Sequence, residues 1–394
     1  MIIYHRQGNI PKRKHIATFD RNNKLIREEL FSTKGFSGEY STLYYSEPPV
    51  CLVENNKIII NNKPEIWGDA PFDYHHFDTF QLKSSGHFIE ARVPMLTNSD
   101  CTIGLFSISK STSVCFQNVS ANELIFVHEG SGVMDSVFGR ISFEKGDYII
   151  IPKGVLYNLT CKNLKRNRFL YVESNSEFQI PKSYLNSSGQ LLETAPYSER
   201  DFKLPVLKKT KQRKNKKFEV IVKRENNWYQ QIHENDLMSA IGWDGYLYPF
   251  AINIEAFCPK VGKIHLPPPV HKIFENDSFV ICNFVPRLLD FHDGAVTAPY
   301  YHMNIDSDEV LYYLDGNFLS RKGVSEGSLT LHPMGLTHGP QPGKQEESIG
   351  KKDTNELAVM IDTFKPLEIC KNMVDCRKSE YTASWLTPKK SKKN

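Results

Sequence analysis

One spacing pattern occurs twice in this chain, once in each half. Each copy has a glutamate, a glycine seven positions later, and then the series Gly-x5-Pro-x-Gly-x2 followed by one further residue. The C-terminal copy consists of Glu309, Gly316, Gly327, Pro333, Gly335 and His338. The N-terminal copy consists of Glu123, Gly130, Gly146, Pro152, Gly154 and Tyr157. Such glycines suit tight turns with positive φ, and Pro-x-Gly suits a bend. The pattern predicts two copies of one β-unit.

Short apolar or alternating runs, separated by Gly, Pro, Asn and Asp, predict β-strands along nearly the whole chain. The clearest runs are 57–61, 124–128, 147–152, 168–174, 278–285, 310–314, 328–332 and 356–362. We therefore expect an all-β protein, with a helix or two near the C-terminus.

A chain of 394 residues is longer than one core usually holds, so two domains are expected. The run LKKTKQRKNKK, residues 207–217, divides the chain near its middle. Because no aromatic residues interleave its cations, we interpret it as a solvated linker and not as a nucleic-acid-binding segment. The predicted domains are 1–206 and 218–394. The lysine-rich tail after Pro388 receives the same interpretation.

Several classes of protein are disfavoured by the sequence. No run of 18 or more apolar residues could span a bilayer. The N-terminus turns basic after three apolar residues, unlike a secretory signal, so we expect a cytoplasmic protein. The eight cysteines show no CxxC or other paired spacing, which argues against a zinc knuckle and a disulfide framework. We expect no nucleic-acid or membrane partner.

The C-terminal copy also carries a set of metal-ligating residue types. His302, Glu309 and His338 have spacings that can bring two imidazoles and one carboxylate to one metal from a group of strands. Two histidines and one carboxylate on one side of an octahedron are typical of non-haem iron(II), with positions left for substrate and oxygen.

The duplicated frame resembles the two-part signature of the cupin superfamily. Its first motif is similar to His302-x-Asn304-x4-Glu309-x6-Gly316, and its second to Gly327-x5-Pro333-x-Gly335-x2-His338. Within that superfamily the chain resembles the homogentisate 1,2-dioxygenase family. The resemblance is carried by PYYHMN (299–304), LTHGP (336–340), Gly242-Trp243-Asp244 with Tyr248-Pro249-Phe250, and the Pro-Arg pair at 286–287. The opening YHRQGNIPKRKH and GFSGEYSTLYYSEPP resemble shorter microbial members.

The resemblance implies a bicupin: two antiparallel jelly-roll barrels, the N-terminal one without metal. It implies an iron(II) enzyme that converts homogentisate and O2 to 4-maleylacetoacetate in tyrosine and phenylalanine catabolism, and a homo-oligomer built on trimers. His302, Glu309 and His338 would hold iron. His265, in the segment KIHLPPPVHK, would be the catalytic base, with His271 as its rival. The residues expected to contact substrate are His338, His332, Tyr301, Asn304 and Phe318.

Three alternatives stay open at this point. Asp308 lies beside Glu309 as a competing carboxylate, although the spacing to Gly316 selects Glu309. Phe318 stands where better known members of the family carry a tyrosine, which implies either one fewer hydrogen bond to the same substrate or a related substrate such as gentisate or another hydroxylated phenylacetate. A cupin that only binds a metal or a small acid is the non-enzymatic alternative. Arg287 is a candidate partner for a carboxylate of the protein or of a substrate.

Overall fold

The structure is a computed structural model that describes residues 3–207 and 217–386. Strands dominate it, and α1 (Lys344–Ser348) is the one α-helix of these residues. The all-β prediction is therefore confirmed. No helix in the described part is long and apolar enough to cross a membrane. The basic run, apart from its two end residues, and the tail after Pro388 lie outside the described residues.

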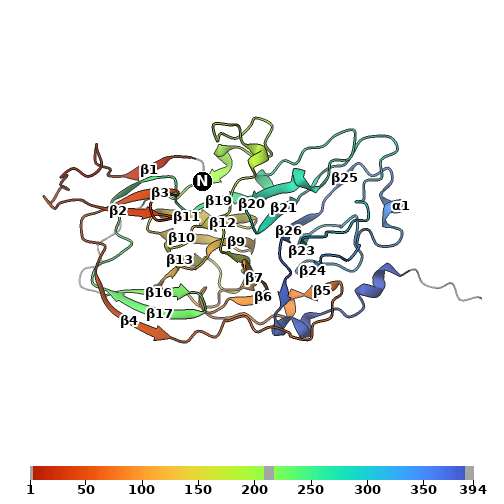
Figure 1. Cartoon of the computed structure of the whole chain (residues 1–394), viewed down its shortest axis with the longest axis horizontal. Coiled ribbons are helices and arrows are strands. Elements are labelled where there is room, and N and C mark those ends of the chain that lie inside the picture. Colours follow the sequence, from red (N-terminus) through yellow and green to blue (C-terminus); the bar gives the residue numbers. More distant parts are fainter. Residues whose placement is uncertain (1–2, 208–216, 387–394) are drawn as a thin grey trace, which may run out of the picture.

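Three large sheets form the body of the molecule, and nearly all neighbouring strands are antiparallel (Figure 1). The seven-stranded sheet has the order β11 (Gly139–Phe143), β10 (Gly132–Ser136), β13 (Leu156–Cys161), β8 (Cys115–Asn118), β16 (Phe218–Arg224), β17 (Asn227–His233) and β4 (Leu52–Ile58). The eight-stranded sheet has the order β15 (Phe202–Lys203), β19 (Phe250–Asn253), β12 (Asp147–Ile151), β9 (Asn122–Glu129), β14 (Arg168–Ser174), β7 (Cys101–Phe106), β6 (Val93–Thr97) and β27 (Glu368–Ile369). The six-stranded sheet has the order β20 (Lys272–Glu275), β21 (Phe279–Phe284), β26 (Leu357–Thr363), β23 (Asp308–Asp315), β24 (Ser328–His332) and β5 (His75–Asp78).

Two smaller sheets complete the set. The four-stranded sheet has the order β1 (His5–Gly8), β18 (Gly242–Gly245), β3 (Tyr40–Tyr45) and β2 (Arg27–Ser32). A two-stranded sheet joins β22 (Arg287–Leu288) and β25 (Asp353–Thr354).

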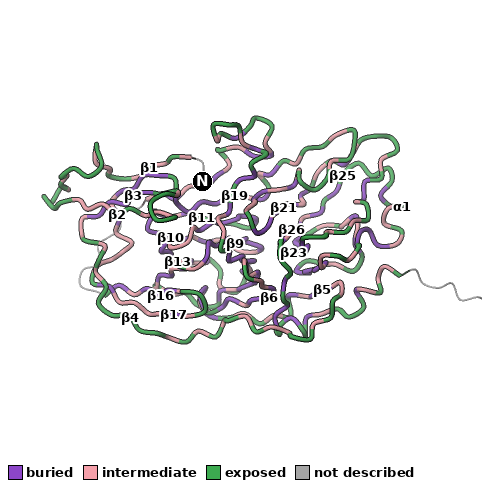
Figure 2. Tube along the Cα trace, viewed as in Figure 1, coloured by how far each residue is buried: buried purple, intermediate pink, exposed green. Residues whose placement is uncertain are grey.

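The eight-stranded sheet is buried on both faces, and this explains its continuous apolar runs. In β9, Leu124 and Phe126 join one hydrophobic core while Ile125 and Val127 join another. The first core also contains residues of the six-stranded sheet, and the second contains residues of the seven-stranded sheet. Because side chains alternate along a strand, a strand between two cores must be apolar at every position. Figure 2 shows the buried central strands in purple.

The sequence repeat corresponds to a repeated strand pairing. Glu123 of β9 lies opposite Ile151 of β12, and Glu309 of β23 lies opposite His332 of β24. The residue opposite the glutamate is in each copy the one directly before the proline of the pattern. The glycines have positive φ in both copies, for example 84° at Gly154 and 80° at its counterpart Gly335. The prediction of two copies of one β-unit is confirmed.

The strands that follow the basic run pair with the N-terminal half of the chain. β16 pairs with β8, β17 with β4, β18 with β3 and β19 with β12. Residues 218–253, which the sequence assigned to the C-terminal domain, thus contribute to the N-terminal sheets. The sequence could not show this, because strand pairing over such distances leaves no local signal. We propose that the division between the two barrels lies after Phe257 and not at the basic run.

A buried ionic network occupies the N-terminal barrel where the C-terminal copy has its metal-ligating residues. The Arg92 guanidinium forms an ion pair with Glu123 and lies 2.9 Å from Glu173 Oε1. It also donates to the Tyr157 hydroxyl at 2.8 Å, and that hydroxyl donates to Glu123 at 2.9 Å. All four side chains are buried. The charge of Glu123 is therefore compensated by a protein cation.

This network predicts a large loss of stability when its cation is removed. Arg92→Met leaves the buried Glu123 without its cation, while Glu173 keeps its ion pair with Lys223, so we expect the free energy of unfolding to fall by about 3–5 kcal/mol. The half-exposed Arg140, paired with Asp135, is the matched control, and Arg140→Met should cost about 1 kcal/mol or less. Chemical denaturation followed by circular dichroism measures both. Equal losses in the two variants would contradict the assignment.

Candidate metal centre

The three residues with metal-ligand spacing come together at one end of the six-stranded sheet. Glu309 is the second residue of β23. His302 and His338 lie on segments joined by an isolated antiparallel bridge, in which each backbone N–H donates to the other residue's carbonyl at 2.8 and 2.9 Å. One donor atom from each of the three side chains lies within 4.8 Å of the others. The bridge thus holds the two imidazoles beside the carboxylate, with ring centroids 4.3 Å apart.

Both imidazoles are oriented by backbone carbonyls. His338 Nδ1 lies 2.9 Å from the Leu336 carbonyl, and His302 Nδ1 lies 3.3 Å from the Tyr300 carbonyl. A carbonyl only accepts, so each Nδ1 carries a proton, and in the neutral ring each Nε2 keeps its lone pair. The two Nε2 atoms point to Glu309, at 3.4 and 3.5 Å from its oxygens. His338 Nε2 is buried and has no hydrogen-bond partner among the described residues.

This donor set fits a divalent metal ion. A buried nitrogen lone pair without a hydrogen bond is costly unless a cation takes it up. Glu309 supplies the negative charge: burial opposes its ionised form, but its interactions with the three surrounding histidines outweigh burial and hold the pKa of Glu309 well below its ordinary value. Two neutral imidazoles and one carboxylate are the ligands that the sequence predicted.

His332 orients Glu309 from behind. Its Nδ1 donates to Glu309 Oε1 at 2.7 Å, and its Nε2 accepts from the Tyr381 hydroxyl at 3.0 Å. Burial lowers the pKa of His332 to about 3, so the ring stays neutral. Both ring nitrogens are thus engaged by the protein. Partners of this kind fix the direction in which a ligating carboxylate points.

Asp308 makes different contacts from its neighbour Glu309. Its two oxygens accept from the backbone N–H groups of Met334 at 2.8 Å and Leu367 at 2.7 Å. Burial raises the pKa of Asp308, and these two hydrogen bonds lower it in part. Successive residues of a strand point to opposite faces. Only Glu309 of the two therefore joins the histidines.

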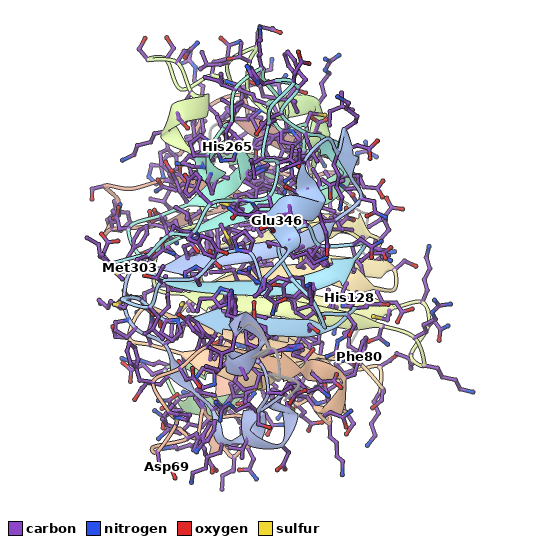
Figure 3. All side chains as sticks on the ribbon, turned by 90° about the vertical axis from the view of Figure 1, so that its right-hand side faces the viewer. Asp69, Phe80, His128, His265, Met303 and Glu346 are labelled. Carbon is purple, nitrogen blue, oxygen red and sulfur yellow. The ribbon has the colours of Figure 1, made fainter. Side chains whose placement is uncertain are left out.

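A cavity of about 390 Å³ opens beside the three residues, and His302 and Glu309 form part of its wall. His265 lies on the same cavity and Figure 3 shows it at this end of the molecule. Its Nδ1 is 3.0 Å from Asp290 Oδ2, and its ring packs edge-on against Tyr300 with centroids 5.4 Å apart. Apolar groups, including Pro267, Leu319 and Phe284, form much of the remaining wall.

The predicted substrate-contacting residues divide into two groups. Asn304 and Phe318 line the cavity. His332, His338 and Tyr301 are not among its lining residues: the two histidines are buried beside Glu309, and Tyr301 is half-exposed and packs against Gly339. Arg287, also on the cavity, is paired with Glu356 at 2.8 Å and so is not available to a substrate carboxylate.

Sequence reasoning missed three residues of this region. These are Asp290, which contacts His265, Tyr381, which contacts His332, and Arg321, which lines the cavity. None stands at a diagnostic spacing from its partner, so the sequence offered no signal for them. A larger cavity, of about 910 Å³, lies at the N-terminal barrel next to Arg92 and Glu173. Among the described residues around it, no three potential metal ligands lie close enough together to share an ion.

Comparisons with known proteins agree on one family. A family model described as homogentisate 1,2-dioxygenase N-terminal matches residues 61–254, and one described as homogentisate 1,2-dioxygenase C-terminal matches residues 262–392. A Saccharolobus solfataricus protein provisionally named a dioxygenase is 37% identical over 98% of this chain and 100% of its own length. Homogentisate 1,2-dioxygenase of Rhodopseudomonas palustris is 25% identical over 86% of this chain and 80% of its own.

Among solved structures, a cupin 2 conserved barrel domain protein from Leptotrichia buccalis aligns with 77% of this chain and 99% of its own, at 11% identity and a TM-score of 0.35. That likeness is too remote to bear on the site.

The geometry predicts that only one of the two adjacent carboxylates is needed for metal binding. Glu309→Gln should lower the affinity for iron(II) by more than about 100-fold, since losses of outer partners alone typically cost about 10- to 100-fold. Asp308→Asn should retain the metal. Metal content after dialysis against a weak chelator, measured by inductively coupled plasma mass spectrometry, distinguishes them. Loss of iron from Asp308→Asn in a folded protein would reverse the assignment.

Proposed function

Since the chain belongs to the homogentisate 1,2-dioxygenase family, we propose that it is an iron(II)-dependent ring-cleaving dioxygenase that converts homogentisate and O2 to 4-maleylacetoacetate in tyrosine and phenylalanine catabolism. One observation carries the proposal: His302, Glu309 and His338 converge beside a cavity that also presents His265. Two imidazoles and one carboxylate cover one side of an iron(II) octahedron and leave positions for substrate and oxygen. Bound iron(II) supplies the redox chemistry that couples an electron-rich ring to O2.

His265 is the proposed base for the phenolic proton of the substrate. Because Asp290 can only accept, His265 Nδ1 donates to it and Nε2 remains a proton acceptor. A phenol with a pKa of ~10 is mostly neutral at pH 7, so a base at the cavity wall is needed. The Asp290 carboxylate also stabilises the imidazolium that forms, as in other histidine–carboxylate pairs.

His271 is the weaker candidate for this role. It also lines the cavity, but burial, with the nearby Arg287 cation, lowers the pKa of His271 to about 3. A ring with so low a pKa is a poor proton acceptor at neutral pH. Its Nδ1 has no hydrogen-bond partner in the described structure, whereas His265 Nδ1 contacts the Asp290 carboxylate.

A second candidate substrate is favoured by Phe318. This ring lines the cavity and packs edge-on against Tyr313, with centroids 4.5 Å apart. A phenylalanine offers no hydrogen bond to a substrate, so a related acid such as gentisate is the alternative. A cupin that binds metal and a small acid without turnover is the non-enzymatic alternative. On the family resemblance we further propose a cytoplasmic homo-oligomer built on trimers.

The proposed activity is tested with protein loaded anaerobically with iron(II). Homogentisate or gentisate is added, air is admitted, and oxygen uptake and the product spectrum are recorded. We expect one O2 consumed per homogentisate and the spectrum of a ring-opened product. Gentisate turnover alone would replace the substrate. No oxygen uptake with either, in protein shown to contain iron, would contradict the enzyme proposal.

The base assignment predicts a separation between metal binding and turnover. His265→Ala should retain iron and lower kcat by about 10²- to 10⁴-fold, the usual contribution of a general base. Asp290→Asn should also retain iron and lower kcat, because an amide can hold the ring in the wrong tautomer. Steady-state oxygen uptake with parallel iron analysis measures both. Full activity of His265→Ala would transfer the role to His271 or to solvent.

A further inference from the structure

We propose that Arg321 binds the carboxylate of the substrate and thereby selects acidic aromatic rings over neutral ones. This inference rests on the proposed function, because it names the residue that recognises the acid group in the same cavity. Arg321 lies in the loop between β23 and β24 and is one of the residues that line the cavity shared by His302 and Glu309.

The Arg321 guanidinium is buried but lacks a carboxylate partner. The residue is 7% exposed. Its Nη1 donates to the backbone carbonyl of Gly339 at 2.6 Å and, more weakly, to that of Ser320 at 3.4 Å. Its Nε is buried and has no hydrogen-bond partner within the described residues. A buried charge without an opposite charge is unfavourable. The unpartnered Nε–H leaves the guanidinium able to donate a hydrogen bond to an anion.

Buried Arg92 and partly buried Arg287 differ from Arg321 in this respect. Arg92 is paired with Glu123 and Glu173, and Arg287, on the same cavity, is paired with Glu356. No described carboxylate forms such a pair with Arg321. The cavity therefore contains one arginine whose charge is already satisfied and one whose charge is not. A planar carboxylate is the natural complement, because it accepts two parallel hydrogen bonds from a guanidinium.

The groups around Arg321 do not neutralise it. The Tyr313 and Tyr381 phenols interact with the guanidinium, but burial raises the pKa of both, so both are uncharged at neutral pH. Glu309 also acts on Arg321 electrostatically. That carboxylate already accepts from His332 at 2.7 Å and belongs to the proposed metal site. Arg321, which lines the cavity, therefore keeps a positive charge that these groups do not neutralise.

Arg321 is held in place on its far side. The Trp385 ring packs against the guanidinium, 5.5 Å from centroid to Cζ, and Trp385 Nε1 donates at 3.0 Å to the same Gly339 carbonyl that accepts from Arg321. Gly339 directly follows His338. The cation is thus fixed relative to a proposed metal ligand. A preorganised arginine loses little freedom on binding, which favours affinity and specificity.

The selected substrate class follows from this arrangement. A ring hydroxyl on the metal side and a carboxylate on the Arg321 side require a hydroxylated aromatic acid, with the ring lying against apolar wall residues such as Leu319 and Phe318. Homogentisate and gentisate both satisfy this requirement. Hydroquinone, which has no acid group, does not.

Binding to the metal-free protein tests the inference without turnover. The ligands are 4-hydroxyphenylacetate and its neutral amide, 4-hydroxyphenylacetamide, titrated by isothermal calorimetry. We expect the native protein to bind the acid about 10- to 100-fold more tightly than the amide, as a charged pair in a buried site allows. Arg321→Gln should abolish this preference, and Arg321→Lys should restore part of it. Arg140→Gln, on the surface of the N-terminal barrel, is the matched control and should behave as the native protein.

Steady-state kinetics with the iron-loaded enzyme give a second readout. Arg321→Gln should raise KM for homogentisate by about 10- to 100-fold with a smaller change in kcat. Equal acid affinity in Arg321→Gln and the native protein, with both shown to be folded by circular dichroism, would overturn the inference.

The two proposals can fail separately. If the acid preference depends on Arg321 but iron-loaded protein consumes no O2, the carboxylate site is supported and the proposed activity is contradicted. If O2 is consumed but the preference for the acid over the amide does not depend on Arg321, the activity is supported and this inference is contradicted.

Discussion

Each barrel contains a buried carboxylate at the start of a central strand, and the rest of each site is arranged around its charge. Glu123 and Glu309 occupy equivalent positions in the repeated frame and are both buried. Ionised groups inside a protein must be compensated, since their transfer from water costs several kcal/mol when no partner is present. The N-terminal barrel meets this need with the guanidinium of Arg92. The C-terminal barrel surrounds Glu309 with three imidazoles, two of which keep lone pairs directed at one point.

These two solutions lead to different properties. An arginine is permanently charged and occupies its position, so we expect the N-terminal site to serve stability and to bind no metal. Neutral imidazoles supply lone pairs without charge, so a cation from solution is still required to balance Glu309. The remaining features of the C-terminal site follow from that centre. The His302–His338 bridge and the His332–Tyr381 pair fix the ligand directions, while His265 and Arg321 line the adjacent cavity.

Local pattern and repeat were enough to predict the strands, the duplicated unit and the grouping of His302, Glu309 and His338. The continuous apolar run around Leu124 and Ile125 predicted a strand, and the structure shows that the two side chains enter different cores. The seven-residue spacing to Gly316 distinguished Glu309 from Asp308. The features that the sequence could not predict depend on contacts between segments far apart in the chain. The roles of Arg92, Asp290 and Arg321 arise only when separate loops meet, and β16 belongs to an N-terminal sheet because it pairs with β8. His332 lies in the predicted region, but its contact with Glu309 instead of the cavity required the three-dimensional structure.

The central claim is that one barrel compensates its buried glutamate with a metal and the other with an arginine. Anomalous X-ray diffraction above and below the iron absorption edge, from crystals grown anaerobically with iron(II), tests it directly. The account predicts one anomalous peak per chain, about 2 Å from His302 Nε2, His338 Nε2 and a Glu309 oxygen, with none at Arg92. A peak at the N-terminal barrel, or no peak among the three C-terminal residues in iron-containing crystals, would contradict it.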